Sequence, residues 1–319
     1  MNRKRDLRER STLNVFPIYL LFLESGKLTE RVTEAEMALH DCHLCGNDCG
    51  IDRTQRAGPC RIGDTAYVAS YGPHHGEEAV LRGRYGSGTI FFSGCNLHCV
   101  YCQNDDISQR VAGQPVTSQA LAAMMLDLEG QGCHNINLVS PTHVAPQIVL
   151  GLAVAIQAGL RLPVVYNTGG YDAPQALHLM DGLIDIYMPD VKYADAAVGQ
   201  RLSLVKDYPA VNRAAVKEMH RQVGDLVLDD RGVARRGLLV RHLVLPGDLA
   251  GTTEVARFLV DKVSRDTYVN VMAQYHPSYK AWACTDENTP LDRRITPQEY
   301  QSALRQARDA GLHRFDQRA

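Results

Sequence analysis

The chain has 319 residues, of which 45% are hydrophobic and 22% are charged, and its formal net charge is −2 at pH 7. This length suits one large domain, or one large and one small domain, and the composition is that of an ordinary globular enzyme. A chain without net positive charge has no general attraction for nucleic acid or for an anionic membrane, so neither is expected as a partner.

The N-terminal segment combines a basic run with an apolar stretch at residues 15–23. That stretch is too short to span a bilayer. Charged residues precede it closely and no small-residue cleavage site follows it cleanly, so a signal peptide is not expected. We predict that the segment packs against the body of the protein.

Seven of the nine cysteines fall into two groups with metal-ligand spacing. The upstream group, C-x2-C-x3-C-x10-C, is Cys42, Cys45, Cys49 and Cys60, and the downstream group, C-x3-C-x2-C, is Cys95, Cys99 and Cys102. Such clustering is not a disulfide framework in a protein of this size, and it indicates a reducing compartment, most simply the cytoplasm. Cys133 and Cys284 stand alone and are predicted to be buried apolar residues.

After residue 86, apolar strand patterns alternate with helical patterns. The predicted strands are residues 88–94, 135–141, 163–170, 184–193, 237–247 and 267–275, and the predicted helices are 117–132, 146–160, 173–183, 208–224, 252–264 and 296–312. Residues 227–237 interrupt this alternation and predict either the tip of a hairpin or a surface excursion.

This alternation is typical of an α/β fold in which helices cover a parallel sheet. Six βα units are too few for a complete eight-stranded barrel, so we predict an open, partial (βα)6 barrel for residues 87–319. A small cysteine-rich extension, residues 1–86, precedes it.

The downstream cysteines lie in the loop at residues 94–104, directly after the first predicted strand. That places them at the carboxyl edge of the sheet, where parallel α/β folds carry their active sites. Three thiolates hold three irons of a [4Fe–4S] cube and leave the fourth iron open to another ligand. The alternative is a zinc ion that His98 or a distant residue completes.

This pattern resembles the radical S-adenosylmethionine (SAM) superfamily, and the likeness covers about residues 40 to 315. The stretches CVYCQN, YNTGGYD, MPDVKYAD and VRHLVLPG are similar to the pyruvate formate-lyase activating enzymes. The N-terminal cysteine pattern with GSGTIFFSG, SPTHVAP and NVMAQYHP is similar to the PflX-type proteins of that branch. The resemblance implies that SAM occupies the open iron and that an electron from the cluster cleaves it. The resulting 5′-deoxyadenosyl radical then takes a hydrogen atom from a substrate.

The loop after the second predicted strand departs from the pattern of the activating enzymes. Those enzymes usually carry Gly-Gly-Glu there, where it meets the methionine amino group of SAM. This chain has Ser140, Pro141 and Thr142 instead. Since no carboxylate is present, backbone carbonyls around Ser140 or the Thr142 hydroxyl would have to accept the ammonium group.

The resemblance assigns the other cofactor contacts to the ends of later strands. They are Asn167, Thr168, Gly169, Asp190, Lys192, Arg241 and His276. Small residues let a cofactor approach the backbone, and a carboxylate beside an ammonium group suits the ribose hydroxyls and the carboxylate of SAM. Simpler interpretations are an ion pair at the end of the fourth strand, an arginine that pairs with a helix, and a solvent-facing histidine.

The upstream cysteines supply four thiols, which complete a closed site. An auxiliary [4Fe–4S] cluster and a structural zinc ion are both open interpretations. The linker at residues 72–83 contains His74, His75, Glu77 and Glu78, which either line the mouth of the site or are polar linker residues.

Two function classes follow. The first is a radical SAM enzyme that takes electrons from a donor such as a flavodoxin or ferredoxin and acts on a partner enzyme, a peptide or a small molecule. The second is a nonenzymatic iron–sulfur electron carrier or sensor. The open three-thiol spacing and the barrel pattern favour the first.

Overall fold

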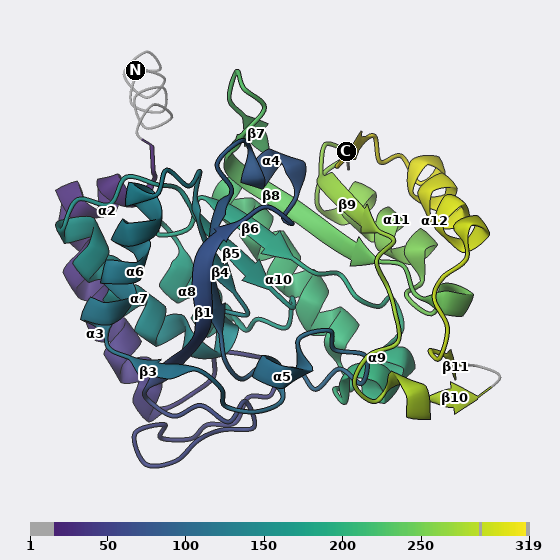
Figure 1. The fold of residues 1–319 in the computed structure, drawn as a ribbon, viewed down its shortest axis with the longest axis horizontal. Coiled ribbons are helices and arrows are strands. Elements are labelled where there is room, and N and C mark those ends of the chain that lie inside the picture. Colours follow the sequence, from purple (N-terminus) through teal and green to yellow (C-terminus); the bar gives the residue numbers. More distant parts are fainter. Residues whose placement is uncertain (1–15, 287–288, 317–319) are drawn as a thin grey trace, which may run out of the picture.

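A sheet of parallel strands forms the centre of the computed structural model, which describes residues 16–286 and 289–316 (Figure 1). In these ranges each predicted strand is present and pairs in parallel with the next in the sheet. The strands are β2 (Ser87–Phe92), β4 (Ile136–Val139), β5 (Val164–Thr168), β6 (Ile186–Pro189), β8 (Ala234–Leu243) and β9 (Tyr268–Met272). The predicted open arrangement of six βα units is therefore confirmed.

Additional strands extend the sheet at both edges. β1 (Ala66–His74) runs antiparallel to β2, and β3 (Gln114–Val116) runs antiparallel to β1. At the other edge, β12 (Arg314–Phe315) pairs in parallel with β9. The sequence pattern did not indicate β1, which brings part of the cysteine-rich extension into the same sheet.

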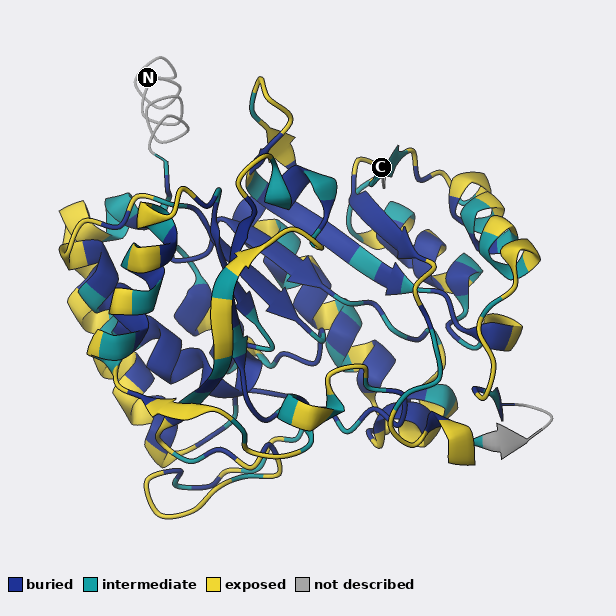
Figure 2. Cartoon of the chain, in the orientation of Figure 1, coloured by how far each residue is buried: buried dark blue, intermediate teal, exposed yellow. Residues whose placement is uncertain are grey.

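Helices surround the sheet, and Figure 2 shows that the strands are largely buried while the outer helical faces are exposed. The predicted helices correspond to α6 (Ser118–Gly130), α7 (Ala145–Gln157), α8 (Pro174–Met180), α10 (Tyr208–Val223), α11 (Thr252–Lys262) and α12 (Pro297–Asp309). Local hydrogen bonds explain where two of them begin. The Thr117 side chain accepts a bond from the Ala120 amide, and Thr296 and Glu299 form a reciprocal capping box.

Several other elements were not predicted. They are α2 (Tyr19–Ser25), α3 (Lys27–His40), α4 (Ala79–Arg82), α5 (Asp105–Ser108), α9 (Ala196–Ser203), β10 (Thr285–Asp286) and β11 (Thr289–Pro290). The predicted hairpin is present, because β7 (Val227–Leu228) pairs antiparallel with β8. Of the two isolated cysteines, Cys133 is buried as predicted, whereas Cys284 is partly exposed.

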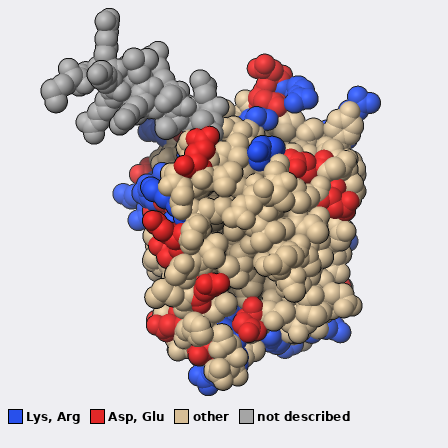
Figure 3. All heavy atoms as spheres, turned by 90° about the vertical axis from the view of Figure 1, so that its left-hand side faces the viewer, with Lys and Arg blue, Asp and Glu red and all other residues tan. Residues whose placement is uncertain are grey.

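The N-terminal segment packs on the barrel, as predicted, over its described residues; residues 1–15, which include the basic run, lie outside them. Tyr19 is fully buried, and its hydroxyl donates to the Leu162 carbonyl at 2.8 Å. In the described ranges, each helix is too short or too polar to cross a membrane. Figure 3 shows the face that α2, α3, α6 and α7 form, where both signs of charge lie around a broad uncharged area.

Strand register brings the loops of the candidate site together. Phe91 of β2 lies opposite Val139 of β4, which lies opposite Asn167 of β5. Beyond β6, Asp190 forms a parallel bridge with Arg241 of β8. Because parallel strands end at the same edge, residues that are far apart in the sequence meet there.

Asp185 gives the fold a testable dependence on pH. Its buried carboxylate accepts hydrogen bonds from the Ile18 amide at 2.8 Å and the Val164 amide at 3.0 Å. Burial nevertheless raises the pKa of Asp185 from 3.8 to about 7. Between these values the folded protein holds a proton that the unfolded chain releases, so its contribution to the free energy of unfolding falls as pH rises.

We expect Asp185→Asn, which has no such proton, to show a flatter profile of unfolding free energy between about pH 5 and pH 8 than the wild type. Urea titrations at each pH measure both profiles. Parallel profiles for the two proteins would contradict the assignment.

Candidate functional site

A cavity of about 380 Å³ opens at the carboxyl ends of the parallel strands. It brings together thiols, charged groups and small residues from separate loops. The predicted site residues that line it are Cys95, Cys99, Cys102, Ser140, Asn167, Thr168, Gly169, Asp190, Lys192 and Arg241. The sheet topology thus assembles in one place most of the residues that the sequence assigned to the cluster and to SAM.

Backbone hydrogen bonds from two other segments hold the three-cysteine loop. The Val100 amide donates to the Leu202 carbonyl at 2.9 Å, and the His98 amide donates to the Ser203 carbonyl at 3.4 Å, both at the end of α9. The Lys280 amide, from the segment after β9, donates to the Val100 carbonyl at 2.8 Å. The loop is therefore positioned by the protein itself.

Each sulfur of this loop has a hydrogen-bonding group beside it. The Leu97 amide donates to the Cys95 sulfur at 3.4 Å. The Ser203 hydroxyl lies 3.0 Å from the Cys99 sulfur, and the Ser108 hydroxyl lies 3.1 Å from the Cys102 sulfur. Sequence reasoning missed both serines, because they come from α9 and α5 and carry no motif.

The donor set fits an iron–sulfur cluster. Three soft thiol donors face one cavity, and hydrogen bonds to sulfur are among the features that tune such clusters. Burial, and then the neighbouring Cys99 thiol, raises the pKa of Cys95 to about 12. A coordinating metal overrides such a shift, because it deprotonates the thiol that binds it.

A group of three charged side chains lies on the cavity wall beside the thiols. The Asp190 carboxylate pairs with the Lys192 ammonium at 2.6 Å and with the Arg241 guanidinium at 2.8 Å. Arg241 also donates to the Asn167 side-chain oxygen at 2.7 Å. The ion pair that the sequence offered as a simpler interpretation therefore exists, but it faces the cavity, and Arg241 faces it too.

Charge pairing keeps this group ionised. Burial alone would raise the pKa of Asp190, but Arg241 and Lys192 together lower it below its usual value. Burial opposes the charge on Lys192 in the same way, and Asp190 more than offsets it, so the pKa of Lys192 is raised. The cavity thus holds two positive side chains and one negative side chain in fixed positions.

The two residues expected to meet the ammonium group of SAM lie in different surroundings. Ser140 lines the cavity and has a left-handed backbone, with φ of 57°. The Thr142 hydroxyl is buried, donates to the Asp172 carboxylate at 2.7 Å and lies 3.0 Å from the Thr168 hydroxyl. Asp172, which sequence reasoning missed, also accepts from Tyr166 at 2.9 Å and Thr168 at 2.7 Å.

The linker residues divide between the cavity and the surrounding core. His74 and Glu77 line the cavity, and the pKa of Glu77 is lowered because the His74 bond and Arg241 outweigh burial. Glu78 is buried and accepts from the Asn270 side chain at 2.8 Å. Neither His75 nor His276 is among the lining residues, although His276 lies 3.2 Å from the Gln103 amide, which does line the cavity.

The four upstream cysteines lie together beside this site. Burial, and then the neighbouring Cys60 and Cys42 thiols, raises the pKa of Cys45 to about 12. Burial and the Cys42 thiol likewise raise the pKa of Cys49. In the described part of the chain, no three His, Cys, Asp or Glu side chains gather as the ligands of a single metal ion do.

The segment at residues 42–60 packs directly on the three-cysteine loop. The side-chain amide of Asn47 donates to the backbone carbonyl of Asn96 at 2.8 Å and lies 3.6 Å from the Cys45 sulfur. Gly94 touches the same segment so closely that a Cβ there would lie 2.6 Å from the Cys60 carbonyl oxygen. The two cysteine groups therefore share one packed region.

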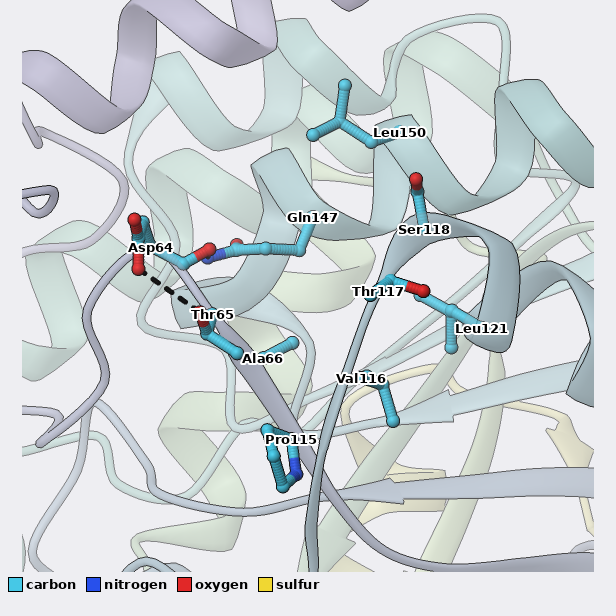
Figure 4. Close-up of a pocket in the computed structure, with 10 residues that line it drawn as sticks. All are labelled: Asp64, Thr65, Ala66, Pro115, Val116, Thr117, Ser118, Leu121, Gln147 and Leu150. Atoms are coloured by element: carbon cyan, nitrogen blue, oxygen red, sulfur yellow. Dashed lines mark hydrogen bonds between the residues drawn. The ribbon is translucent and has the colours of Figure 1, made fainter.

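A second cavity, of about 340 Å³, lies at the beginning of α6 (Figure 4). Its lining includes Asp64, Thr117 and the Gln147 side chain, whose amide donates to the Asp64 carbonyl at 2.8 Å. Its lining residues include no cysteine and no residue that the sequence assigned to a site.

Comparisons with known proteins agree with an iron–sulfur site. A family model described as a 4Fe-4S single cluster domain matches residues 82–175, which include the three-cysteine loop. The uncharacterized protein MJ0674 of Methanocaldococcus jannaschii is 32% identical over 301 residues, which cover 92% of this chain and 82% of the relative. This chain belongs to the family of that archaeal protein.

One solved structure, of TYW1 with a lysine–pyruvate adduct bound, is similar in outline. It covers 69% of this chain and 73% of its own, with a TM-score of 0.41 and 8% sequence identity.

Two adjacent glycines at the end of β5 allow a matched test of the cavity wall. Gly170 has a φ of 76°, and a Cβ there would lie 2.2 Å from the Asp190 carbonyl oxygen. At Gly169, the nearest atom is the flexible end of Leu97 at 3.0 Å. We expect Gly170→Ala to lower the free energy of unfolding by at least about 1–2 kcal/mol, the cost of a left-handed backbone, and Gly169→Ala to lower it less.

Urea unfolding of both variants beside the wild type makes this comparison. Equal free energies of unfolding for the two variants would contradict the close packing of Gly170 on Asp190.

Proposed function

We propose that this protein is a radical SAM enzyme. The observation that supports the proposal is one cavity in which three thiols suited to a four-iron cluster lie beside a charged group from the neighbouring strands. When bound, cluster and SAM supply a 5′-deoxyadenosyl radical that abstracts hydrogen from a substrate. The protein's own residues bind, orient and shield these groups.

The roles of the cavity residues follow from their chemistry. Cys95, Cys99 and Cys102 hold iron and leave one coordination position free. Lys192 offers an ammonium group to the carboxylate of SAM, and Asp190 offers a carboxylate to the ribose hydroxyls. Because Asp190 is also bound to Arg241, its orientation is set before any ligand arrives.

Other lining residues complete the cavity. Gly169 lets a ligand approach the backbone, and Ser140, which lines the cavity, is assigned to the ammonium group of SAM. Leu243 and Met272 present apolar surface that helps to exclude water. We assign His74 and Glu77 to the substrate, because they are a histidine and a carboxylate of the lining that the SAM contacts leave unused.

The same proposal extends to the partners. The substrate is a protein or a small molecule, with activation of a partner enzyme as one form of the reaction. The electron donor is a small redox protein such as a flavodoxin or ferredoxin. The upstream cysteines hold a closed metal group that delivers electrons or supports the mouth of the barrel. Their position beside the three-cysteine loop supports this role.

Cleavage of SAM tests the proposal. Anaerobically reconstituted protein, reduced with dithionite, should form 5′-deoxyadenosine from SAM, and a variant with Ala at Cys95, Cys99 and Cys102 should form none. Cys133→Ala removes a buried thiol away from the cavity and should retain the activity, which controls for the loss of cysteine itself. Cleavage by the triple variant at the wild-type rate would show that the assignment is wrong.

Metal analysis tests the upstream group. Wild-type protein should carry about eight irons if that group holds a second cluster, or about four irons and one zinc if it holds zinc. A Cys42→Ala/Cys45→Ala variant should lose only the upstream metal and still cleave SAM with dithionite, because four thiolates leave no position for SAM. A variant that keeps the first cluster and cleaves no SAM would contradict this division of roles.

A further inference from the structure

A chain of buried hydroxyl groups ends at the sulfur of Cys99. The Tyr101 and Tyr193 hydroxyls lie 2.6 Å apart, the Tyr193 hydroxyl lies 2.7 Å from that of Ser203, and Ser203 lies 3.0 Å from the Cys99 sulfur. Ser203 is fully buried, and the two tyrosines are nearly so. The sequence does not reveal this chain, because its members come from the three-cysteine loop, the segment after β6 and the end of α9.

Aromatic packing holds the two phenol rings. Tyr101 meets Tyr275 edge to face at 5.9 Å between ring centroids, and Tyr193 meets Tyr208 at 5.3 Å. The Tyr208 hydroxyl in turn lies 2.9 Å from the carbonyl oxygens of both Gly169 and Asp190, which share its one proton. The oxygens are thus fixed by packing on the cavity wall.

The direction of the hydrogen bonds follows from the state of Cys99. As an iron ligand, Cys99 is a thiolate and can only accept, so Ser203 donates to it. The Ser203 oxygen then accepts from Tyr193, and the Tyr193 oxygen accepts from Tyr101. Burial raises the pKa of Tyr193 well above its usual value, so its proton is present at neutral pH.

We propose that Tyr101, Tyr193 and Ser203 form a directed relay of hydrogen bonds that raises the reduction potential of the cluster through the Cys99 sulfur. This proposal rests on the proposed function, because it needs a cluster on the three downstream cysteines. The residues act through Cys99 and are positioning residues for the reduction step.

The physical reason lies in the charge of the cluster. Reduction adds an electron, and part of the added charge resides on the thiolate sulfurs. A donor hydrogen bond stabilises the more negative, reduced form more than the oxidised form, so it raises the potential. Each hydroxyl behind Ser203 polarises the next, which strengthens the final bond to sulfur.

The chains of hydrogen bonds that end at the Cys95 and Cys102 sulfurs are shorter. Behind Cys102, the Ser108 hydroxyl accepts from the Gln109 side-chain amide at 3.1 Å. Beside Cys95, the donor is the Leu97 amide at 3.4 Å. Cys99 therefore has the longest hydroxyl relay among the bonds that the described residues form, and its loss should have the clearest effect.

Single-oxygen variants separate the relay from packing. Ser203→Ala removes the donor to sulfur, Tyr193→Phe removes the middle hydroxyl and Tyr101→Phe removes the terminal one. Tyr275→Phe is the matched control, because its hydroxyl donates to the Leu291 carbonyl while its ring packs on Tyr101. The measurement is the midpoint potential of the downstream cluster, by redox titration without SAM, in protein that also carries Cys42→Ala and Cys45→Ala.

The reference is the protein that carries Cys42→Ala and Cys45→Ala alone. Relative to it, we expect a negative shift of the potential that is smallest in Tyr101→Phe, larger in Tyr193→Phe and largest in Ser203→Ala. Tyr275→Phe should keep the reference potential. An exchangeable proton coupled to the reduced cluster should also be weakened in Ser203→Ala, as seen by electron–nuclear double resonance after exchange into heavy water. Unchanged potentials in all three relay variants, with iron content intact, would overturn the relay and leave the proposed function standing.

Two further outcomes are decisive. If Ser203→Ala holds no iron, the two phenylalanine variants, which keep Ser203 beside Cys99, decide the question by the same shift. If the reference protein binds no cluster on the downstream cysteines, the relay and the proposed function fall together.

Discussion

The candidate site depends on the parallel pairing of β2, β4, β5, β6 and β8. The carboxyl ends of these strands lie at one edge of the sheet. The three-cysteine loop, Ser140, Gly169 and the charged side chains of Asp190, Lys192 and Arg241 therefore meet there, although more than a hundred residues separate the first from the last. A slip of one residue in any of these pairings would turn the adjacent side chains to the opposite face of the sheet. The same pairing therefore determines both the fold and the contents of the cavity.

Burial of charge explains much of the wall chemistry. Asp190, Lys192 and Arg241 can lie in the barrel because each charged group has an opposite partner within hydrogen-bonding distance. Asp172 is buried and forms no ion pair with the described residues, and hydroxyls from Thr142, Tyr166 and Thr168 solvate its carboxylate instead. The group of Asp190, Lys192 and Arg241 faces the cavity and has charge to offer a ligand. The hydroxyl cluster around Asp172 fixes the strand ends behind it.

Local sequence patterns were enough to predict the parallel strands, the main helices and the three-cysteine loop. Each of these leaves a signal within a short window: an apolar run, a helical period with a cap, or a fixed cysteine spacing. Asn167, Asp190, Lys192 and Arg241 were assigned through the family resemblance, whose motifs lie at or near the ends of these strands. The position of these side chains in one cavity follows from register alone.

The remaining features depend on tertiary contacts that no short window records. β1 alternates irregularly and becomes a strand by pairing with β2. Thr142 looked available to a ligand, but Asp172, thirty positions later, engages its hydroxyl. Ser203 reaches the Cys99 sulfur across 104 positions. Such partners are chosen by packing, so they emerge only once the chain is folded.

The central claim is that SAM binds directly to the iron that the three downstream cysteines leave open. Electron–nuclear double resonance of the reduced protein, with SAM isotopically labelled at its amino nitrogen, measures this contact without reference to any substrate. The account predicts a hyperfine coupling between that nitrogen and the cluster, with the signal of the label replaced by that of the natural nitrogen isotope when unlabelled SAM is used. An intact, reduced four-iron cluster that shows no coupling to labelled SAM at saturating concentration would contradict it.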